Sequence, residues 1–343
     1  RALRREPVDR VPIFMWFHPD TAKLLAAELE IEPGDLGTAF GDDIRQAWVG
    51  NNHAMEGIVH EHDGEGHTDV WGIEWRKLGP FNQTVREPLK YASVDEIRTY
   101  RFPYNHADEL LTNMEPVLRT ADEHFIGCDV SPCAFEMVCR LCGMERAIMD
   151  LAADPETAGY LIAACTEFAR HMSTLAVERF PLDWLWTGDD VGGQHGMIMS
   201  PNMWRELIRP HLEPVFRIGK DAGLWVAYHS CGAIRPIIPD LIEMGLDVLN
   251  PIQRGCPGMD PTELKAEFGA DLAFMGGVDT QGMLPRVTPD EVRAETESLI
   301  ETMTSDGGGY ILAASHTVPP ETPLANIFAM YEAAGVTEEE IRD

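Results

Sequence analysis

Residues 224–232 read Leu-Trp-Val-Ala-Tyr-His-Ser-Cys-Gly, an apolar run that ends in a histidine and a cysteine two positions apart. Such a run between Gly223 and Gly232 is typical of a strand in a parallel sheet that is covered on both faces. Because side chains alternate along a strand, His229 and Cys231 point the same way. They are either two metal ligands at a strand end or a buried thiol beside a hydrogen-bonded histidine.

On both sides of this stretch, short apolar runs alternate with amphipathic helices, which indicates a parallel sheet with crossover helices. Strands are expected at residues 11–17, 124–130, 183–187, 224–228, 248–252, 272–275 and 310–313. Helices are expected at 20–30, 136–150, 156–178, 200–219, 235–244, 261–268, 289–303 and 324–334. With one more strand in the irregular region 42–105, the sequence predicts a (β/α)8 TIM barrel, a single domain over residues 1–343.

Residues 42–105 are expected to form an insertion that covers the C-terminal face of the barrel, with short strands at 71–75 and 84–89. Glycine and proline interrupt this region, unlike the regular chain after residue 124. Trp48, Trp71 and Trp75 either line a pocket there or pack the insertion onto the barrel. The helix at 20–30 is expected to be capped by Asp20 or Thr21.

Barrel active sites lie at the C-terminal ends of the strands, and the residues at these ends carry reactive groups. Zinc accepts histidine nitrogen and cysteine sulfur, and a catalytic site typically has three protein ligands and an open position. The candidate zinc ligands are His229, Cys231 and His316. The candidate catalytic residues are Asp189, Asp190 and Asp279, each of which is either a fourth ligand or an orienting partner of a ligand histidine. Asp189 or Asp190 is alternatively a general acid, or only a helix cap hydrogen-bonded among the strand ends. Without a metal, the histidines would instead bind substrate carboxylates.

The composition excludes some classes of partner. Asp and Glu total 57 against 27 Lys and Arg, and a net charge of -30 repels nucleic acid and anionic membranes. No run of 18 apolar residues exists, and residues 1–5 lack the apolar core of a signal peptide. The seven cysteines are expected to be reduced thiols in a cytoplasmic protein, with the pair Cys139 and Cys142 in the core rather than on a metal.

Several motifs, in order, resemble the uroporphyrinogen decarboxylase superfamily and, within it, the corrinoid (cobalamin)-dependent methyltransferase branch. They lie at residues 229–232 (His-Ser-Cys-Gly), 240–253, 276–281 (Gly-Gly-Val-Asp-Thr-Gln), 308–316 and 320–327. Residues 2–12 and 188–194 fit as well, so the likeness covers nearly the whole chain.

This resemblance implies a barrel that moves a methyl group between a small molecule and the cobalt of a separate corrinoid protein. In that branch a His-x-Cys pair and a later cysteine hold zinc, and here His316 stands in the position of the later cysteine. The favoured substrate is a methoxylated or methylated small molecule, as in O-demethylation, and the resemblance suggests a homodimer. The residues assigned to substrate contact are Asn250, Gln253, Gln194, Trp16 and Trp71.

A decarboxylase that acts on a carboxylated substrate is the alternative. True uroporphyrinogen decarboxylases carry the segment Met-Arg-Gln-Ala-Gly-Arg, which grips substrate carboxylates, but residues 16–19 here read Trp-Phe-His-Pro. A substrate with eight carboxylates needs cationic partners, and paired arginines are the natural ones. A third class, a non-catalytic corrinoid or substrate binding protein, would apply if the residues at the strand ends did not converge on one cavity.

Overall fold

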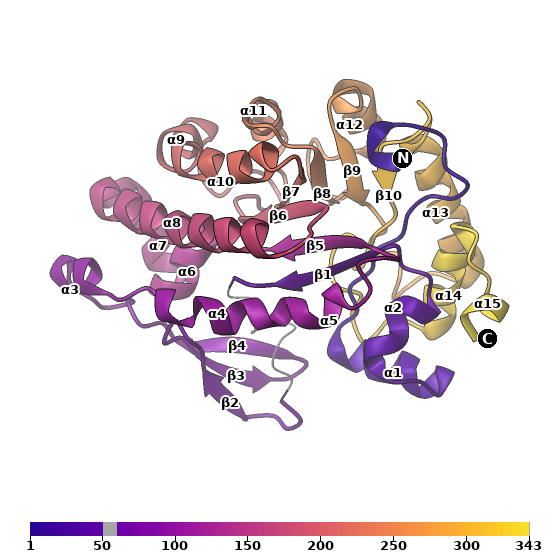
Figure 1. Cartoon of the computed structure of the whole chain (residues 1–343), viewed down its shortest axis with the longest axis horizontal. Helices are drawn as coiled ribbons and strands as arrows, with labels where there is room; N and C mark the ends of the chain where they lie inside the picture. The colour runs from indigo at the N-terminus through magenta and orange to yellow at the C-terminus, as the bar shows by residue number, and fades with distance from the viewer. Residues whose placement is uncertain (51–59, 343) are drawn as a thin grey trace.

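The computed structural model describes residues 1–50 and 60–342. Its centre is a curled parallel sheet of seven strands, whose order in space follows their order in the sequence (Figure 1). The strands are β1 (Ile44–Trp48), β5 (Phe125–Asp129), β6 (Trp184–Gly188), β7 (Trp225–His229), β8 (Val248–Ile252), β9 (Ala273–Gly276) and β10 (Tyr310–Ile311). The additional strand that the sequence predicts within the irregular region is β1, which pairs with β5.

The sequence predicts a regular strand over residues 11–17, and here the described structure differs. Ile13 forms an isolated parallel bridge with Leu312 rather than part of a continuous ladder. Pro12 has no N–H to donate, which limits the ladder that this segment can form. On its other side, the Asp43 N–H donates to the Ile13 carbonyl at 2.9 Å. The segment lies between β10 and β1 without a regular eighth strand, so the predicted barrel is observed as a curled sheet of seven strands.

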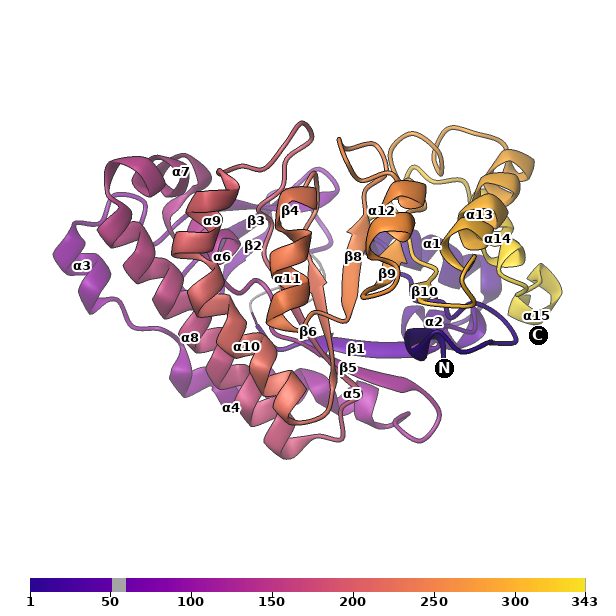
Figure 2. The ribbon, with the colours of Figure 1, turned by 90° about the horizontal axis from the view of Figure 1, so that it is seen from above.

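Helices connect successive strands and lie along the outside of the sheet (Figure 2). After β5 they are α6 (Phe135–Cys142), α7 (Met144–Ala153), α8 (Pro155–Arg179), α9 (Pro201–Leu207), α10 (Arg209–Asp221), α11 (Ile238–Met244), α12 (Pro261–Phe268), α13 (Pro289–Met303), α14 (Leu324–Ala333) and α15 (Glu338–Arg342). Before β5 lie α1 (Pro19–Leu29), α2 (Leu36–Ala39), α3 (Val94–Thr99), α4 (Ala107–Leu111) and α5 (Glu115–Leu118). Among the described residues, no helix is both long and apolar enough to span a membrane.

Two predicted helices are each divided in two. The expected helix at 136–150 is α6 and α7, because Gly143 between them has a φ of 80°, which ends the first helix. The expected helix at 200–219 is α9 and α10, divided at Ile208. The first helix, α1, is capped by the His18 side chain, which accepts from the Asp20 N–H at 3.1 Å. The predicted caps, Asp20 and Thr21, lie instead inside the helix, after proline at its first position.

The sheet has an apolar layer on each face. On the concave face, Trp184 and Trp186 of β6 pack with Phe14, Met275 and further strand residues in one cluster. On the convex face, the alternate strand residues pack with the helices in a second, larger cluster. Because the concave face is filled by side chains along most of its height, the free space lies at the strand ends.

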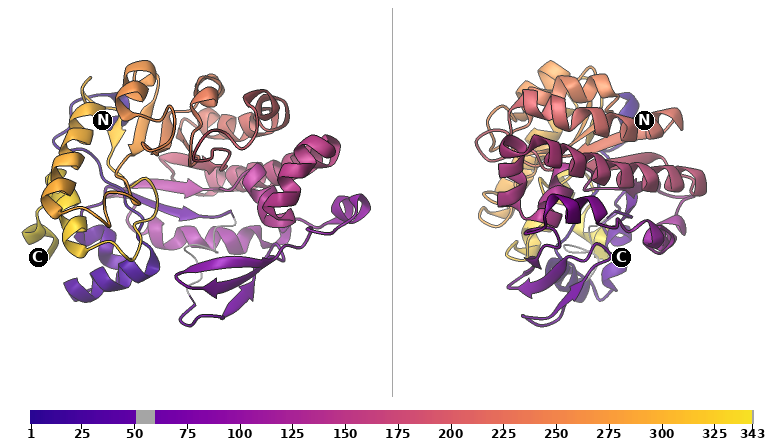
Figure 3. Two further views of the ribbon diagram at one scale, coloured as in Figure 1. Left: turned by 180° about the vertical axis from the view of Figure 1, so that it is seen from behind. Right: turned by 90° about the vertical axis from the view of Figure 1, so that its left-hand side faces the viewer.

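The region 42–105 holds a second, antiparallel sheet of β2 (Gly66–Thr68), β3 (Glu74–Leu78) and β4 (Phe81–Arg86), which projects from the body of the molecule (Figure 3). The predicted strands at 71–75 and 84–89 correspond to β3 and β4, shifted by a few residues. The hairpin between β3 and β4 contacts the start of α1, where His18 Nε2 lies 2.7 Å from the Pro80 carbonyl oxygen. The Phe81 ring meets the His18 ring edge to face at 5.0 Å.

The buried carboxyl of Asp42, just before β1, is hydrogen-bonded to Tyr331 of α14. From its burial we expect an unusual pH dependence of the stability of the folded protein. The Asp42 side chain accepts from the Tyr331 hydroxyl at 2.8 Å and from the Met15 N–H at 3.3 Å. Burial raises its pKa from 3.8 to about 7. Because the folded-state pKa exceeds the unfolded one, the folded state loses stability from this group as pH rises from about 4 to about 7, by about 4 kcal/mol at most.

Replacing Asp42 with asparagine is therefore expected to raise the melting temperature at pH 8 relative to the natural chain and to give no comparable gain at pH 4. Asparagine keeps one oxygen acceptor and does not titrate. Thermal unfolding of both proteins across this pH range measures the effect. Parallel curves, with the same difference at every pH, would contradict the expectation.

Candidate functional site

The predicted ligand pair lies at the C-terminal end of β7, where a neighbouring amide orients the histidine. His229 is in register with Asn250 of β8, and His229 Nδ1 lies 2.6 Å from Asn250 Oδ1. The Asn250 amide nitrogen donates to the Met275 carbonyl, which assigns its oxygen to His229. His229 Nδ1 therefore carries the proton, and Nε2 keeps a lone pair that faces Cys231.

Three ligand atoms converge at this point. His229 Nε2 lies 3.5 Å from Cys231 Sγ and 3.7 Å from Asp190 Oδ1. These three residues, which we call the ligand trio, have their ligand atoms within 4.8 Å of one another. Zinc bonds of about 2.3 Å to sulfur and about 2.0 Å to nitrogen or oxygen put neighbouring tetrahedral ligands roughly 3.3 to 3.6 Å apart. The donor set and its spacing therefore fit one zinc ion.

Asp190 reaches this position because the Cys231 N–H donates to Asp190 Oδ1 at 2.8 Å. Asp190 lies two residues after β6, whose last residue, Gly188, is opposite His229 of β7. Burial, together with the negative charges of Asp190 and Glu136, raises the pKa of the Cys231 thiol well above its usual value. A divalent cation at the trio would reverse that effect, because coordination deprotonates a thiol.

The third predicted ligand, His316, lies beside the trio. Within the described chain the group of converging ligand atoms contains Asp190, His229 and Cys231 and does not include His316. The His316 and His229 ring centroids are 6.4 Å apart. Burial and the neighbouring His229 lower the pKa of His316, so its ring is neutral at neutral pH.

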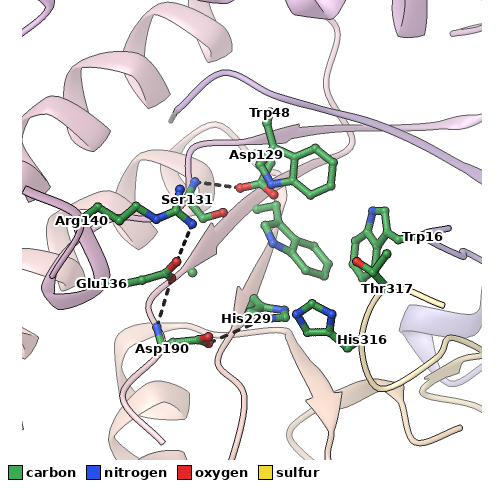
Figure 4. A pocket seen from close by; sticks show the side chains of 12 residues that line it. Trp16, Trp48, Asp129, Ser131, Glu136, Arg140, Asp190, His229, His316 and Thr317 are labelled. Atoms are coloured by element: carbon green, nitrogen blue, oxygen red, sulfur yellow. Dashed lines mark hydrogen bonds and ion pairs between the residues drawn. The ribbon is translucent and has the colours of Figure 1, made fainter. Parts of the chain in front are cut away.

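On one side of the trio is a small pocket of about 80 Å³, which we call the inner pocket (Figure 4). Its walls come from the ends of β1, β5 and β6 and from the start of α6. The lining residues are Trp16, Trp48, Asp129, Ser131, Glu136, Arg140, Trp186, Gly188, Asp190, His229, His316 and Thr317. Of the residues predicted for the site, Trp16, Asp190, His229 and His316 line this pocket.

On the other side is a broader cavity of about 510 Å³, which we call the outer cleft. It is lined by Gln194, Cys231, Gln253, Arg254, Gly255, Asp279, Thr280, Gln281, Gly282, Arg286, Ser315 and His316. Gln253 accepts from the Gly232 N–H at 2.7 Å. Asp279 accepts from the N–H groups of Gln281 and Gly282 and so shapes its own loop. His316 lines both cavities.

Three described residues predicted for the site line neither cavity. Asn250, which the sequence assigned to substrate contact, is fully buried and contacts His229 instead. Asp189 is fully buried, and its carboxylate accepts from the Glu136 N–H at 2.7 Å at the start of α6. Burial raises the Asp189 pKa to about 8. Trp71 is buried against Phe168, with ring centroids 4.8 Å apart. Asp189 therefore matches the alternative of a helix cap, and Trp71 matches that of packing within the fold, as does Trp75, which is also buried.

The structure adds residues that the sequence did not single out. Glu136 binds Arg140 at 2.6 Å, and its other oxygen accepts from the Asp190 N–H at 3.4 Å. Asp129, at the end of β5, is fully buried and faces the inner pocket. Asp129 could have been predicted from its position at the C-terminal end of a strand, as the other candidates were. Glu136 and Arg140 could not, because their spacing of four residues is that of any ion pair along a helix.

The sequence matches known proteins over most of its length. The family model for uroporphyrinogen decarboxylase (URO-D) matches residues 84–335. The methylated-thiol–coenzyme M methyltransferase of Methanosarcina mazei is 21% identical over 277 residues, which are 80% of this chain and 64% of that protein. The chain thus spans a little less than two thirds of that relative's length.

Among solved structures, a methyltransferase from Methanosarcina mazei matches with a TM-score of 0.67 at 16% identity, covering 97% of this chain and 96% of that one. At this identity the likeness concerns the fold, and it covers nearly the whole of both chains. The URO-D model, by contrast, matches the sequence itself and includes every residue of the ligand trio. The chain therefore belongs to the uroporphyrinogen decarboxylase family.

Proposed function

We propose that the protein is a zinc-dependent methyltransferase that moves a methyl group between a methylated or methoxylated small molecule and the cobalt of a corrinoid protein. The observation that carries this proposal is the position of the ligand trio between two cavities, one small and aromatic, the other broad and polar. A group transfer needs two reactants on opposite sides of one point. The inner pocket would hold the small molecule, and the outer cleft would admit the corrinoid.

Zinc held by Asp190, His229 and Cys231 would polarise the heteroatom that exchanges the methyl group. The chain's own residues prepare that position. Asn250 fixes the His229 ring by its hydrogen bond to Nδ1, and Asp190 is fixed by the Cys231 N–H. The aromatic walls of the inner pocket would exclude water from the reacting atoms. We assign Gln194, Gln253 and Asp279 to contacts in the outer cleft.

The proposal also covers the small sheet, the domain and oligomeric state, and the cellular setting. The small sheet of region 42–105 would cover the mouth of the site. Two observations support this: the Pro80 carbonyl of its hairpin contacts His18, and Phe81 and His316 line the same third cavity. The whole chain would act as one domain and as a homodimer. The reduced cysteines favour a cytoplasmic setting. The net charge of -30 disfavours nucleic acid and anionic membranes as partners, and the proposed partner is a corrinoid protein.

The relatives support the reaction class, because the two described above are named as methyltransferases. The decisive experiment combines metal analysis with a methyl-transfer assay. The purified protein should contain one zinc per chain and should demethylate methylcobalamin, or methylate reduced cobalamin, with a panel of thiols and methyl ethers. Release of carbon dioxide from a carboxylated substrate without any corrinoid would favour the decarboxylase instead. A protein without stoichiometric metal would contradict the zinc assignment.

A further inference from the structure

The ligand trio comes from two neighbouring strand ends, which continue as two loops. The β6 loop, residues 190–193, follows β6 and carries Asp190, and the β7 loop, residues 230–233, follows β7 and carries Cys231. Figure 4 shows Asp190 and His229 pointing toward one another from separate segments of the chain. The carboxylate therefore reaches the other two ligands only if the β6 loop stays close to the β7 loop.

Hydrogen bonds join these two loops along their length. They run from the Cys231 N–H to Asp190 Oδ1 at 2.8 Å, from the Val191 N–H to Ser230 Oγ at 3.2 Å, and from the Ala233 N–H to the Gly193 carbonyl oxygen at 3.0 Å. Because a hydrogen bond weakens steeply once donor and acceptor move beyond about 3.2 Å, these bonds hold only while the two backbones remain in contact.

The two backbones meet at Gly192. A Cβ atom added at Gly192 would lie 2.3 Å from the Cys231 carbonyl oxygen and 3.0 Å from the Gly232 carbonyl carbon. Non-bonded heavy atoms pack at about 3.5 Å, so a side chain at this position would push the loops apart by roughly 1 Å. The nearest atom belongs to the backbone, which cannot rotate out of the way as the tip of a side chain can.

Gly232 faces Gly192 from the β7 loop. A Cβ atom added at Gly232 would lie 2.6 Å from the Gly192 carbonyl carbon and 2.7 Å from the Gly193 nitrogen. Gly232 also has a φ of 83°, in the left-handed region that favours glycine. The φ of Gly192 lies outside that region, so at Gly192 the close approach of the loops is the reason for glycine.

We propose that Gly192 is a positioning residue of the metal site: it lets the β6 loop lie against the β7 loop and so brings the Asp190 carboxylate to His229 and Cys231. Metal–ligand distances vary by only about 0.2 Å, so a shift of roughly 1 Å would take the carboxylate out of the site. His229 and Cys231 both belong to β7 and its loop, so their spacing of 3.5 Å does not need the β6 loop. That the trio holds a metal rests on the proposed function, whereas the packing of the loops does not.

Titration with Co(II), which takes the place of zinc and absorbs visible light, tests this role. Gly192→Ala should lose about ten- to a hundredfold in cobalt affinity, the range found when a group that orients a ligand is lost. The d–d absorption of the bound ion should change, because the carboxylate no longer coordinates it. The thiolate-to-cobalt absorption should remain, because Cys231 still binds.

The matched control is Gly196→Ala, the same substitution in the same connection between β6 and α9. A Cβ atom added at Gly196 would have nothing within 4 Å. This variant should keep its cobalt affinity within about twofold and its spectrum unchanged.

A double-mutant cycle separates positioning of Asp190 from a general disturbance of the site. In Asp190→Asn the anionic ligand is already gone, so adding Gly192→Ala should lower cobalt affinity by less than about twofold further. A general disturbance would instead give the same loss with and without the carboxylate.

Circular dichroism checks that Gly192→Ala folds. If it does not, Ser230→Ala takes its place, because it removes the acceptor of the Val191 N–H and weakens the join between the loops without adding an atom. Its cobalt affinity should fall at least about threefold, and by less when Asp190→Asn is also present.

Unchanged cobalt affinity and an unchanged spectrum in folded Gly192→Ala, or in Ser230→Ala where that variant replaces it, would overturn the inference. So would equal losses with and without Asp190→Asn. A natural chain that binds cobalt through the trio but exchanges no methyl group with methylcobalamin would refute the proposed function and keep the role of Gly192. A natural chain that takes up no cobalt would refute the zinc assignment and the inference together.

Discussion

Replacing Cys231 with serine is expected to remove zinc from the purified protein and, with it, methyl transfer. Sγ of Cys231 is the only sulfur of the ligand trio, and it lies 3.5 Å from His229 Nε2. A serine hydroxyl stays protonated at neutral pH and is a weak zinc ligand. Loss of groups that merely orient a ligand costs roughly ten- to a hundredfold in metal affinity, so loss of the ligand itself should cost more than about a hundredfold.

The matched control is Cys256→Ser, which changes a buried thiol on the loop that follows β8. Its Sγ lies 3.7 Å from the Gln194 side-chain oxygen, and it is outside the ligand trio. Zinc per chain, measured by mass spectrometry of the metal, should stay near one in this variant and fall near zero in Cys231→Ser. Stoichiometric zinc in Cys231→Ser would refute the metal assignment.

The strand within residues 224–232 was predicted correctly, because a short apolar run between turn residues is typical of a strand buried on both faces of a sheet. The alternation of side chains also brought His229 and Cys231 together, as expected. The helix limits were predicted less well. A single glycine, Gly143, with a φ of 80°, divides one expected helix into α6 and α7.

The sequence alone could not identify Asp190 as the third member of the ligand trio. Asp189 and Asp190 are adjacent, and nothing in the pattern indicates which of them faces the site. The choice depends on two hydrogen bonds from distant residues, since Glu136 donates to Asp189 and Cys231 donates to Asp190. Trp71 was unpredictable for the same reason, because its burial against Phe168 depends on how region 42–105 folds back.

A large loss of zinc affinity is also expected in Asp190→Asn, and only a small change in His316→Ala. If the ligand trio is the metal site, the asparagine variant should lose at least about tenfold in zinc affinity, because it replaces an anionic ligand by a neutral one. Asparagine keeps an oxygen that can accept from the Cys231 N–H, so the loop should keep its position. In His316→Ala, zinc affinity should change less than about twofold.

Titration of both apoproteins with zinc against a fluorescent chelator separates these expectations. The reverse order, with zinc lost in His316→Ala and kept in Asp190→Asn, would mean that His316 moves about one side-chain length to become the third ligand. Methyl transfer alone cannot distinguish the two cases, because His316 lines both the inner pocket and the outer cleft. Its loss would change the walls of both cavities and slow the reaction even if zinc stays bound, so only the metal titration distinguishes the two cases.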